Sequence, residues 1–239
     1  MHYLINILVN TYLSLIPHSA IMRSFCITSL YNTSDAVFYA PSLIGEKLDI
    51  TANITSYSFA KEFHDYAFSI KYERVGAGIH FKGTKNINEK SLYVASSREL
   101  NTISMGLGFT IQDRFYYELS SKSFGILASV SNKTSELLYG ATTLLDLSGQ
   151  TFTTSLFASF NSSFGVTHLN LTITDGIKSF SIAQDLSIFP LINLSFGSTN
   201  YPSCYFVGLF LKNYIKPLIN FRYLPDLGFV TTSGIEYTF

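Results

Sequence analysis

From about residue 48 to the last residue, the chain consists of short runs in which apolar and polar positions alternate. Successive side chains of an extended strand point to opposite faces, so each run places its apolar residues together. In the run at 66–72, the even positions are aromatic or aliphatic, and the odd positions hold Ala67, Ser69 and Lys71. A barrel wall with one face on lipid requires this division. The pattern therefore predicts an all-β chain, a closed antiparallel transmembrane β-barrel.

The runs give about 14 candidate strands, with 12 as the alternative if weak runs are loops, because bacterial barrels of this kind prefer even numbers. The runs lie at 48–54, 66–72, 79–81, 103–111, 115–119, 124–130, 137–145, 152–160, 166–173, 180–186, 191–196, 205–211, 218–223 and 229–239. Connections at 113–114, 148–150 and 175–176 are short and polar, as turns are. The charged stretch 82–101 predicts the most elaborate loop.

The last eight residues end on an aromatic side chain. Their spacing resembles the C-terminal insertion signal of bacterial outer-membrane β-barrels, with Thr232, Gly234, Tyr237 and Phe239 at its four defined positions. We expect this strand to pair with the first strand near 48–54 and close the barrel. The alternative for this stretch is a buried edge strand of a soluble β-sandwich.

The composition favours a lipid-facing exterior. Charged residues make up 13 % of the chain, against about 25 % in soluble domains, and aromatic residues reach 15 %. The 16 basic and 16 acidic residues cancel, which gives no reason to expect a nucleic-acid partner. After residue 23 the chain lacks the ~20 continuous apolar residues that a membrane helix needs. Spanning by strands is therefore expected.

Residues 1–20 are predicted to be a secretory signal peptide, because they are mainly apolar and end on Ser19 and Ala20. No basic residue precedes the apolar stretch, so two alternatives stay open: the segment is retained, or it is a membrane anchor helix. Cys26 and Cys204 are too few for a disulfide scaffold, and whether they are bonded to each other is left open.

Residues 35–43 read Asp-Ala-Val-Phe-Tyr-Ala-Pro-Ser-Leu. This stretch resembles the junction before the first strand of FadL-like outer-membrane barrels, which include long-chain fatty acid transporters and smaller barrels associated with type IX secretion. Ala40 stands where Asn is usual, and Arg23 and Ser24 replace a glycine pair. The resemblance implies that residues 21–44 enter the lumen as a hatch and that residues 45–239 form the barrel.

The same resemblance implies that hydrophobic small molecules such as fatty acids pass across the outer membrane. Phe25, Phe38 and Tyr39 would then be the hatch aromatics nearest the ligand. The competing interpretation is a structural, protein-anchoring or secretion-accessory barrel without a transported ligand. In either case we expect an integral protein of the bacterial outer membrane whose partners are the membrane lipid and the barrel assembly machinery.

The inward polar candidates are Lys71, His80, Lys82, Glu118 and Asp185. They are few and mixed in sign, whereas a wide water-filled porin would line its channel with more charge. We interpret them as groups that pair across the lumen and hold barrel and hatch together. No metal-ligand spacing, nucleophile elbow or phosphate loop occurs, so no enzyme, cofactor or metal is predicted.

Overall fold

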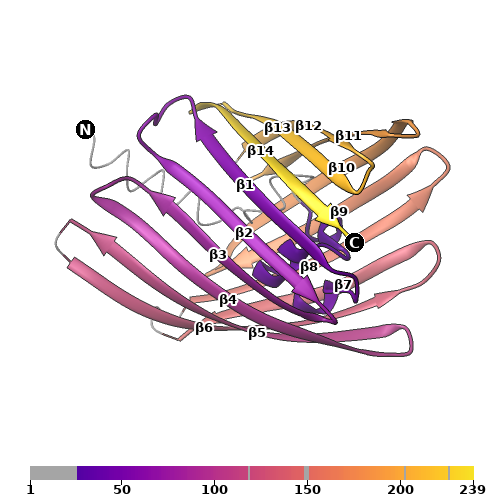
Figure 1. Ribbon diagram of the computed structural model, residues 1–239, viewed down its shortest axis with the longest axis horizontal. Helices are drawn as coiled ribbons and strands as arrows, with labels where there is room; N and C mark the ends of the chain where they lie inside the picture. The colour runs from indigo at the N-terminus through magenta and orange to yellow at the C-terminus, as the bar shows by residue number, and fades with distance from the viewer. Residues whose placement is uncertain (1–25, 118, 148–150, 202, 226) are drawn as a thin grey trace.

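The protein folds as a closed antiparallel barrel of fourteen strands in the part of the chain that the computed structural model describes, residues 26–117, 119–147, 151–201, 203–225 and 227–239 (Figure 1). The strands are β1 (Asp49–Tyr57), β2 (His64–Tyr72), β3 (Val75–Gly83), β4 (Ile87–Leu100), β5 (Ile103–Tyr116), β6 (Leu119–Lys133), β7 (Leu137–Asp146), β8 (Thr151–Ser162), β9 (Gly165–Thr174), β10 (Ile177–Phe189), β11 (Ile192–Asn200), β12 (Ser203–Leu211), β13 (Ile215–Leu224) and β14 (Gly228–Thr238). Each strand pairs with its sequence neighbours, which confirms the predicted fold class and strand number.

The barrel closes between its first and last strands. The register runs from Asp49 opposite Thr238 to Tyr57 opposite Val230, so β14 pairs with β1 as the alternation predicts. Phe239 N–H continues the ladder by donating to Leu48 O at 3.0 Å. We call the edge where β1 begins and β14 ends the terminal rim, and the opposite edge the distal rim.

The two faces of the wall differ as the alternation predicts. Phe109 and Ile235 point outward and are 56 % and 55 % exposed, whereas Thr110 and Thr232 point into the lumen and are buried. The outer face is thus mainly apolar, as contact with lipid requires, and carries charges such as Lys90 only toward the rims. Tyr72 and Tyr223 are exposed near strand ends, where rings with a polar tip suit a membrane interface.

The predicted loop at 82–101 is wrong, because most of it forms β4. The predicted turn at 113–114 is also wrong, because these residues lie within β5 and the chain turns at Tyr117. One strand was therefore missed and another divided in two, and the total is unchanged. The error has one physical cause: near the distal rim both faces of β4 and β5 carry charges, as at Glu89 and Lys90, so the apolar alternation fades. The turn at 175–176 is confirmed by positive φ angles of 48° and 86°.

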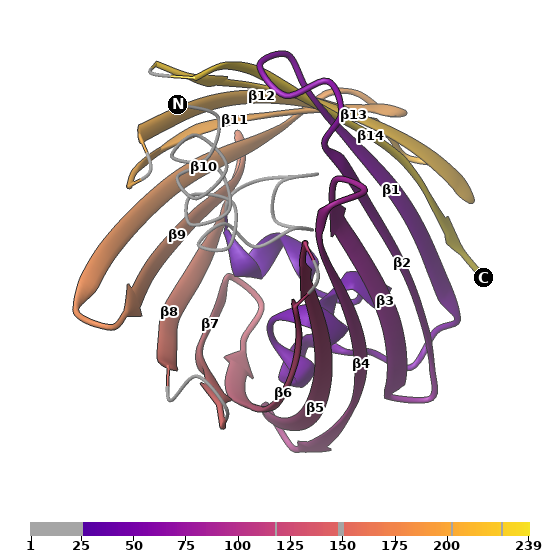
Figure 2. The ribbon, with the colours of Figure 1, turned by 90° about the vertical axis from the view of Figure 1, so that its left-hand side faces the viewer.

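Residues 26–45 form a luminal segment inside the barrel (Figure 2). It contains three short 3₁₀ helices, η1 (Ile27–Leu30), η2 (Ser34–Phe38) and η3 (Pro41–Leu43). The helix η1 lies against β8 and β9, η2 against β1 to β4, and η3 against β4 to β6. The expected signal peptide at 1–20 lies outside the described residues.

No helix within the described ranges is long and apolar enough to cross a membrane.

Candidate functional site

The luminal segment is tied to the barrel wall by the carboxylate of Asp35, which is only 5 % exposed. One carboxylate oxygen accepts a hydrogen bond from Ser69 Oγ of β2 at 2.5 Å, and the other accepts one from Asn53 Nδ2 of β1 at 3.2 Å. A buried carboxylate is costly unless it is hydrogen-bonded, so these partners make its position favourable. They fix η2 against the first two strands.

Ser34 adds two contacts to the same strand pair. Its backbone N–H donates to Asp49 Oδ1 at 2.6 Å, and its hydroxyl donates to Thr51 Oγ1 at 2.9 Å. Because Ser69 Oγ also lies 2.9 Å from Ser34 Oγ, the contacts of Ser34 and Asp35 form one connected network. We call these residues the latch: Ser34, Asp35, Asp49, Thr51, Asn53 and Ser69.

Lys71 holds the end of the segment where the chain leaves the lumen. Its side chain comes from β2, points inward and is buried. Its ammonium donates to the backbone carbonyl of Lys47 at 2.6 Å and to that of Gly45 at 3.4 Å. This predicted luminal lysine therefore contacts the last residue of the segment and the connection to β1.

A glycine residue in the wall lets η3 approach it closely. A Cβ atom at Gly106 of β5 would lie 2.3 Å from the backbone carbonyl carbon of Pro41 and 2.3 Å from Ser42 N. The same Ser42 N–H donates to Ser129 Oγ of β6 at 2.6 Å. Glycine at position 106 is thus required for the segment to lie where it does.

Two of the three aromatic residues of the predicted ligand site, Phe38 and Tyr39, are part of this packing. Phe38 is 4 % exposed, and its ring meets that of Tyr93 edge-on with centroids 4.9 Å apart. Tyr39 is partly buried, and its carbonyl accepts a hydrogen bond from Thr142 Oγ1 at 2.7 Å. Phe25 lies outside the described residues. Phe38 therefore fills space between segment and wall.

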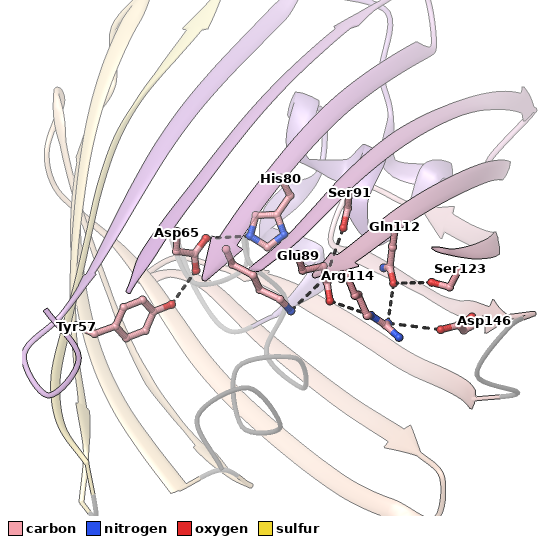
Figure 3. A network of polar contacts seen from close by, with 10 residues as sticks. Tyr57, Asp65, His80, Glu89, Ser91, Gln112, Arg114, Ser123 and Asp146 are labelled. Atoms are coloured by element: carbon pink, nitrogen blue, oxygen red, sulfur yellow. Dashed lines mark hydrogen bonds and ion pairs between the residues drawn. The ribbon is translucent and has the colours of Figure 1, made fainter. Parts of the chain in front are cut away.

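Near the distal rim, β1 to β3 carry the first part of a polar network on the luminal face (Figure 3). Tyr57 Oη donates to Asp65 Oδ2 at 2.7 Å, and the other oxygen of Asp65 lies 2.9 Å from His80 Nε2. Asp65 thus joins two neighbours on either side of β2. His80 is among the predicted inward residues, whereas Asp65 is not, although the inward parity of Ala67 and Ser69 extends to Asp65.

The network continues along the wall through charged side chains of β3 to β7. Glu89 lies 3.4 Å from Lys82 Nζ and 3.1 Å from Arg114 Nε, and Arg114 Nη2 lies 3.6 Å from Asp146 Oδ2. Opposite charges alternate, so each charge has a neighbour that compensates it. Glu89, Arg114 and Asp146 were not among the predicted luminal residues. Glu89 lies in the predicted loop, Arg114 in the predicted turn, and Asp146 one residue beyond the predicted run 137–145.

Asp185, another predicted luminal residue, occupies the opposite part of the wall. It comes from β10, and its Oδ2 lies 3.2 Å from Nε2 of His168 of β9. Glu118 lies outside the described residues. The structure therefore brings His80 and Lys82 into the neighbourhood of one network, places Lys71 at the segment and Asp185 apart from both.

Several buried polar atoms of the wall have no protein partner among the described residues. They include both amide atoms of Asn220 on β13 and the hydroxyl of Ser195 on β11. The register places these two residues on either side of Gly208, whose lack of a side chain leaves room between them. Buried polar groups are normally satisfied by protein or by ordered water. Water is therefore expected in this part of the lumen.

Apolar packing anchors the beginning of the described segment. Cys26 is buried among Tyr57, Phe206 and Val230, and Cys204 belongs to the same cluster. Both cysteines are free thiols. Burial raises the pKa of the Cys26 thiol well above its ordinary value, and the nearby carboxylate of Asp185 raises it further. Among the described residues, no group of three potential ligands could hold a metal ion.

No protein-family model matches the chain, and no curated protein matches it. Solved structures do. Omp33 of Acinetobacter baumannii has a TM-score of 0.58 at 5 % identity, covering 81 % of this chain and 98 % of that one. A triple mutant of the Rhodopseudomonas blastica porin has a TM-score of 0.50 at 7 % identity, covering 81 % and 99 %. The KdgM porin follows with 0.49 at 11 % identity, covering 80 % and 99 %.

These similarities concern the fold. With its apolar outer wall, the chain has the architecture of an integral outer-membrane β-barrel, and the structures it resembles are those of an outer membrane protein and a porin.

Proposed function

We propose that the protein is a porin-like barrel of the bacterial outer membrane through which small polar solutes pass when the luminal segment yields. The observation that carries this proposal is the chemistry of the inner wall. Its buried positions are dominated by hydroxyl, amide and charged side chains, including Asn170, Ser195 and Asn220. A hydrated polar surface of this kind favours solutes that exchange hydrogen bonds with water.

The luminal segment makes this passage conditional. Its apolar side chains, such as Val37 and Leu43, are 1 % exposed, so the segment fills its part of the lumen as a protein core would. The latch ties it to β1 and β2 through hydrogen bonds that water can replace. Passage therefore requires a displacement of the segment, and its frequency depends on the strength of the latch.

A second candidate is the passage of hydrophobic small molecules, as the resemblance to FadL-like barrels implies. The observation in its favour is the apolar cluster in the lumen near the distal rim, where Tyr57, Phe63 and Phe206 meet Cys26. Against it, Phe38 is packed against Tyr93, and the barrel wall is hydrogen-bonded between every pair of neighbouring strands. We therefore place polar solutes first.

Proteoliposomes that contain the purified full-length chain distinguish the candidates. Swelling in an isotonic arabinose solution measures polar-solute entry, and transfer of a fluorescent fatty acid into albumin-loaded vesicles measures hydrophobic passage. We expect swelling faster than in empty vesicles of the same lipid, with unchanged fatty-acid transfer. Accelerated fatty-acid transfer without swelling would establish the second candidate instead. The absence of both would favour a structural or protein-anchoring barrel.

A further inference from the structure

A recess at the terminal rim has the composition of an anion-binding site. Its volume is about 540 Å³, and it lies between the connection into β1, the turn between β12 and β13, and the first residues of β13. Lys47, Lys212 and Lys216 line it from these three separate places. We call it the terminal-rim recess. It lies at the opposite end of the barrel from the distal network, and it adjoins the latch through Thr238, whose Oγ1 donates to Asp49 Oδ2 at 2.7 Å.

Two of the three ammonium groups are held in place by neighbouring side chains. Lys212 Nζ donates to Ser187 Oγ at 2.7 Å. Lys216 Nζ lies 2.6 Å from Glu236 Oε1 and 3.1 Å from Thr238 Oγ1. An ammonium group has three N–H donors, so Lys212 retains donors beyond its bond to serine. Lys47 is exposed at the mouth. Glu236 is paired with Lys216, and Asp49, which accepts a hydrogen bond from Thr238 Oγ1 at 2.7 Å, lies opposite Lys71 of β2. Neither Lys47 nor Lys212 forms a salt bridge among the described residues, so these two lysines supply the positive charge of the recess.

Two asparagines add further donors, because their oxygens are already used. Tyr214 N–H donates to Asn213 Oδ1 at 2.8 Å. Ser187 accepts its hydrogen bond from Lys212, so its own hydroxyl proton is donated to Asn193 Oδ1 at 3.0 Å. In both asparagines the –NH₂ group remains available, and both residues line the recess. The recess therefore offers a set of donors with few acceptors.

Apart from Thr238, the rest of the lining is aromatic: Phe210, Tyr214 and Phe239. Phe210 is buried at the inner side, while Tyr214 is 74 % exposed at the rim. An occupant that satisfies both parts of the lining needs an anionic head and an apolar body. The number of donors favours a head with several acceptor oxygens over a carboxylate, which has two oxygens.

We propose that the terminal-rim recess binds a phosphate group carried on an apolar body. Two sources have this chemistry, a soluble phosphate ester that reaches the mouth of the lumen and the headgroup of an anionic phospholipid at the rim. The proposal stands on the recess alone and does not require passage through the barrel. A protein that conducts no solute could still bind such a ligand.

Isothermal titration of the full chain in neutral detergent tests the binding. The probes are phenyl phosphate, inorganic phosphate and the uncharged benzyl alcohol. We expect phenyl phosphate to bind more tightly than inorganic phosphate, and benzyl alcohol to show no saturable binding. Replacing Lys47 and Lys212 together, as Lys47→Gln and Lys212→Gln, is expected to weaken binding at least about tenfold, because hydrogen bonds to charged groups are lost. Lys216 is left intact since it compensates Glu236.

The matched control carries Lys61→Gln and Lys85→Gln, which remove two exposed lysines at the distal rim. A second arm counts phosphatidic acid bound to the protein from phosphatidylcholine nanodiscs by native mass spectrometry. Binding in either arm that depends on Lys47 and Lys212 supports the proposal and identifies the source. Equal weakening in the control variant, equal binding of benzyl alcohol, or no lysine-dependent binding in either arm would overturn it.

Discussion

Asp35 of the luminal segment accepts a hydrogen bond from Ser69 Oγ of β2 at 2.5 Å, inside a lumen where the carboxylate is almost wholly buried. The segment is thereby tied to the wall by a group that is costly to bury without its partners. The same group is well solvated once water reaches it. The contact thus stabilises the segment in the closed lumen, and hydration of the carboxylate can release it. A gate needs such a reversible contact, which apolar packing alone does not provide.

The first prediction concerns the accessibility of Cys26 in a Cys204→Ala protein, where it is the only thiol. We expect slow reaction with a maleimide at pH 8, because the side chain is buried and its raised pKa keeps the thiolate fraction low. Its rate should keep rising with pH after that of an exposed cysteine has levelled off. Ser163→Cys, in a protein without Cys26 and Cys204, supplies the exposed comparison. Equal rates at both positions would show that the beginning of the segment is not packed against the wall at Cys26.

Removal of the Asp35 carboxylate should loosen the luminal segment. Asp35→Ala leaves Ser69 and Asn53 without their acceptor, which should weaken docking of the segment by about 1–3 kcal/mol. Arabinose swelling and Cys26 labelling should both become faster, while the folded barrel persists as judged by its heat-dependent gel mobility. Glu62→Ala removes an exposed carboxylate between β1 and β2 and should change neither rate. If Asp35→Ala and Glu62→Ala behave alike, the latch does not hold the segment.

A methyl group added to the wall at position 106 should also loosen the luminal segment, in this case by steric overlap. Gly106→Ala places a Cβ atom 2.3 Å from backbone atoms of Pro41 and Ser42, so η3 must move, at a cost of about 1–3 kcal/mol. The matched control is Gly76→Ala, whose Cβ would meet its neighbours at 3.4–3.5 Å, an ordinary contact. Faster Cys26 labelling is expected in Gly106→Ala alone. A response of equal size in both variants would point to general loosening of the barrel.

Phe239 is predicted to matter for assembly. It is 60 % exposed on the outer face, its ring meets that of Tyr237 edge-on at 4.1 Å, and its N–H extends the closing ladder. Phe239→Ala should lower the fraction of chains that reach the folded, membrane-embedded form, measured by heat-dependent gel mobility of cell envelopes. Phe164→Ala, an 83 % exposed aromatic in the turn between β8 and β9, should not. Equal yields for the two variants would contradict an assembly role.

Which side chains face lipid could be predicted from the sequence. Side chains of a strand alternate between two faces, and in a membrane barrel one face contacts lipid while the other faces the polar lumen. The prediction failed where that contrast disappears: Glu89 and Arg114 lie near the distal rim, where β4 and β5 carry charge on both faces. The latch could not be predicted either. Asp35 was part of a recognisable junction, but its partners Asn53 and Ser69 lie 18 and 34 positions away on two strands. Only the strand register determines that they meet its carboxylate.

The most direct test of the central claim, that the luminal segment controls passage through a polar lumen, is an engineered disulfide within the latch. Ser34 Oγ and Thr51 Oγ1 are 2.9 Å apart, so cysteines at both positions can form a bond, and Cys26→Ala and Cys204→Ala remove competing thiols. Conductance is recorded in planar lipid bilayers before and after reduction. We predict that the oxidised protein is closed, that reduction restores openings, and that proteins with Ser34→Cys or Thr51→Cys alone do not respond. Equal conductance in the oxidised and reduced states, or none in either, would contradict the account.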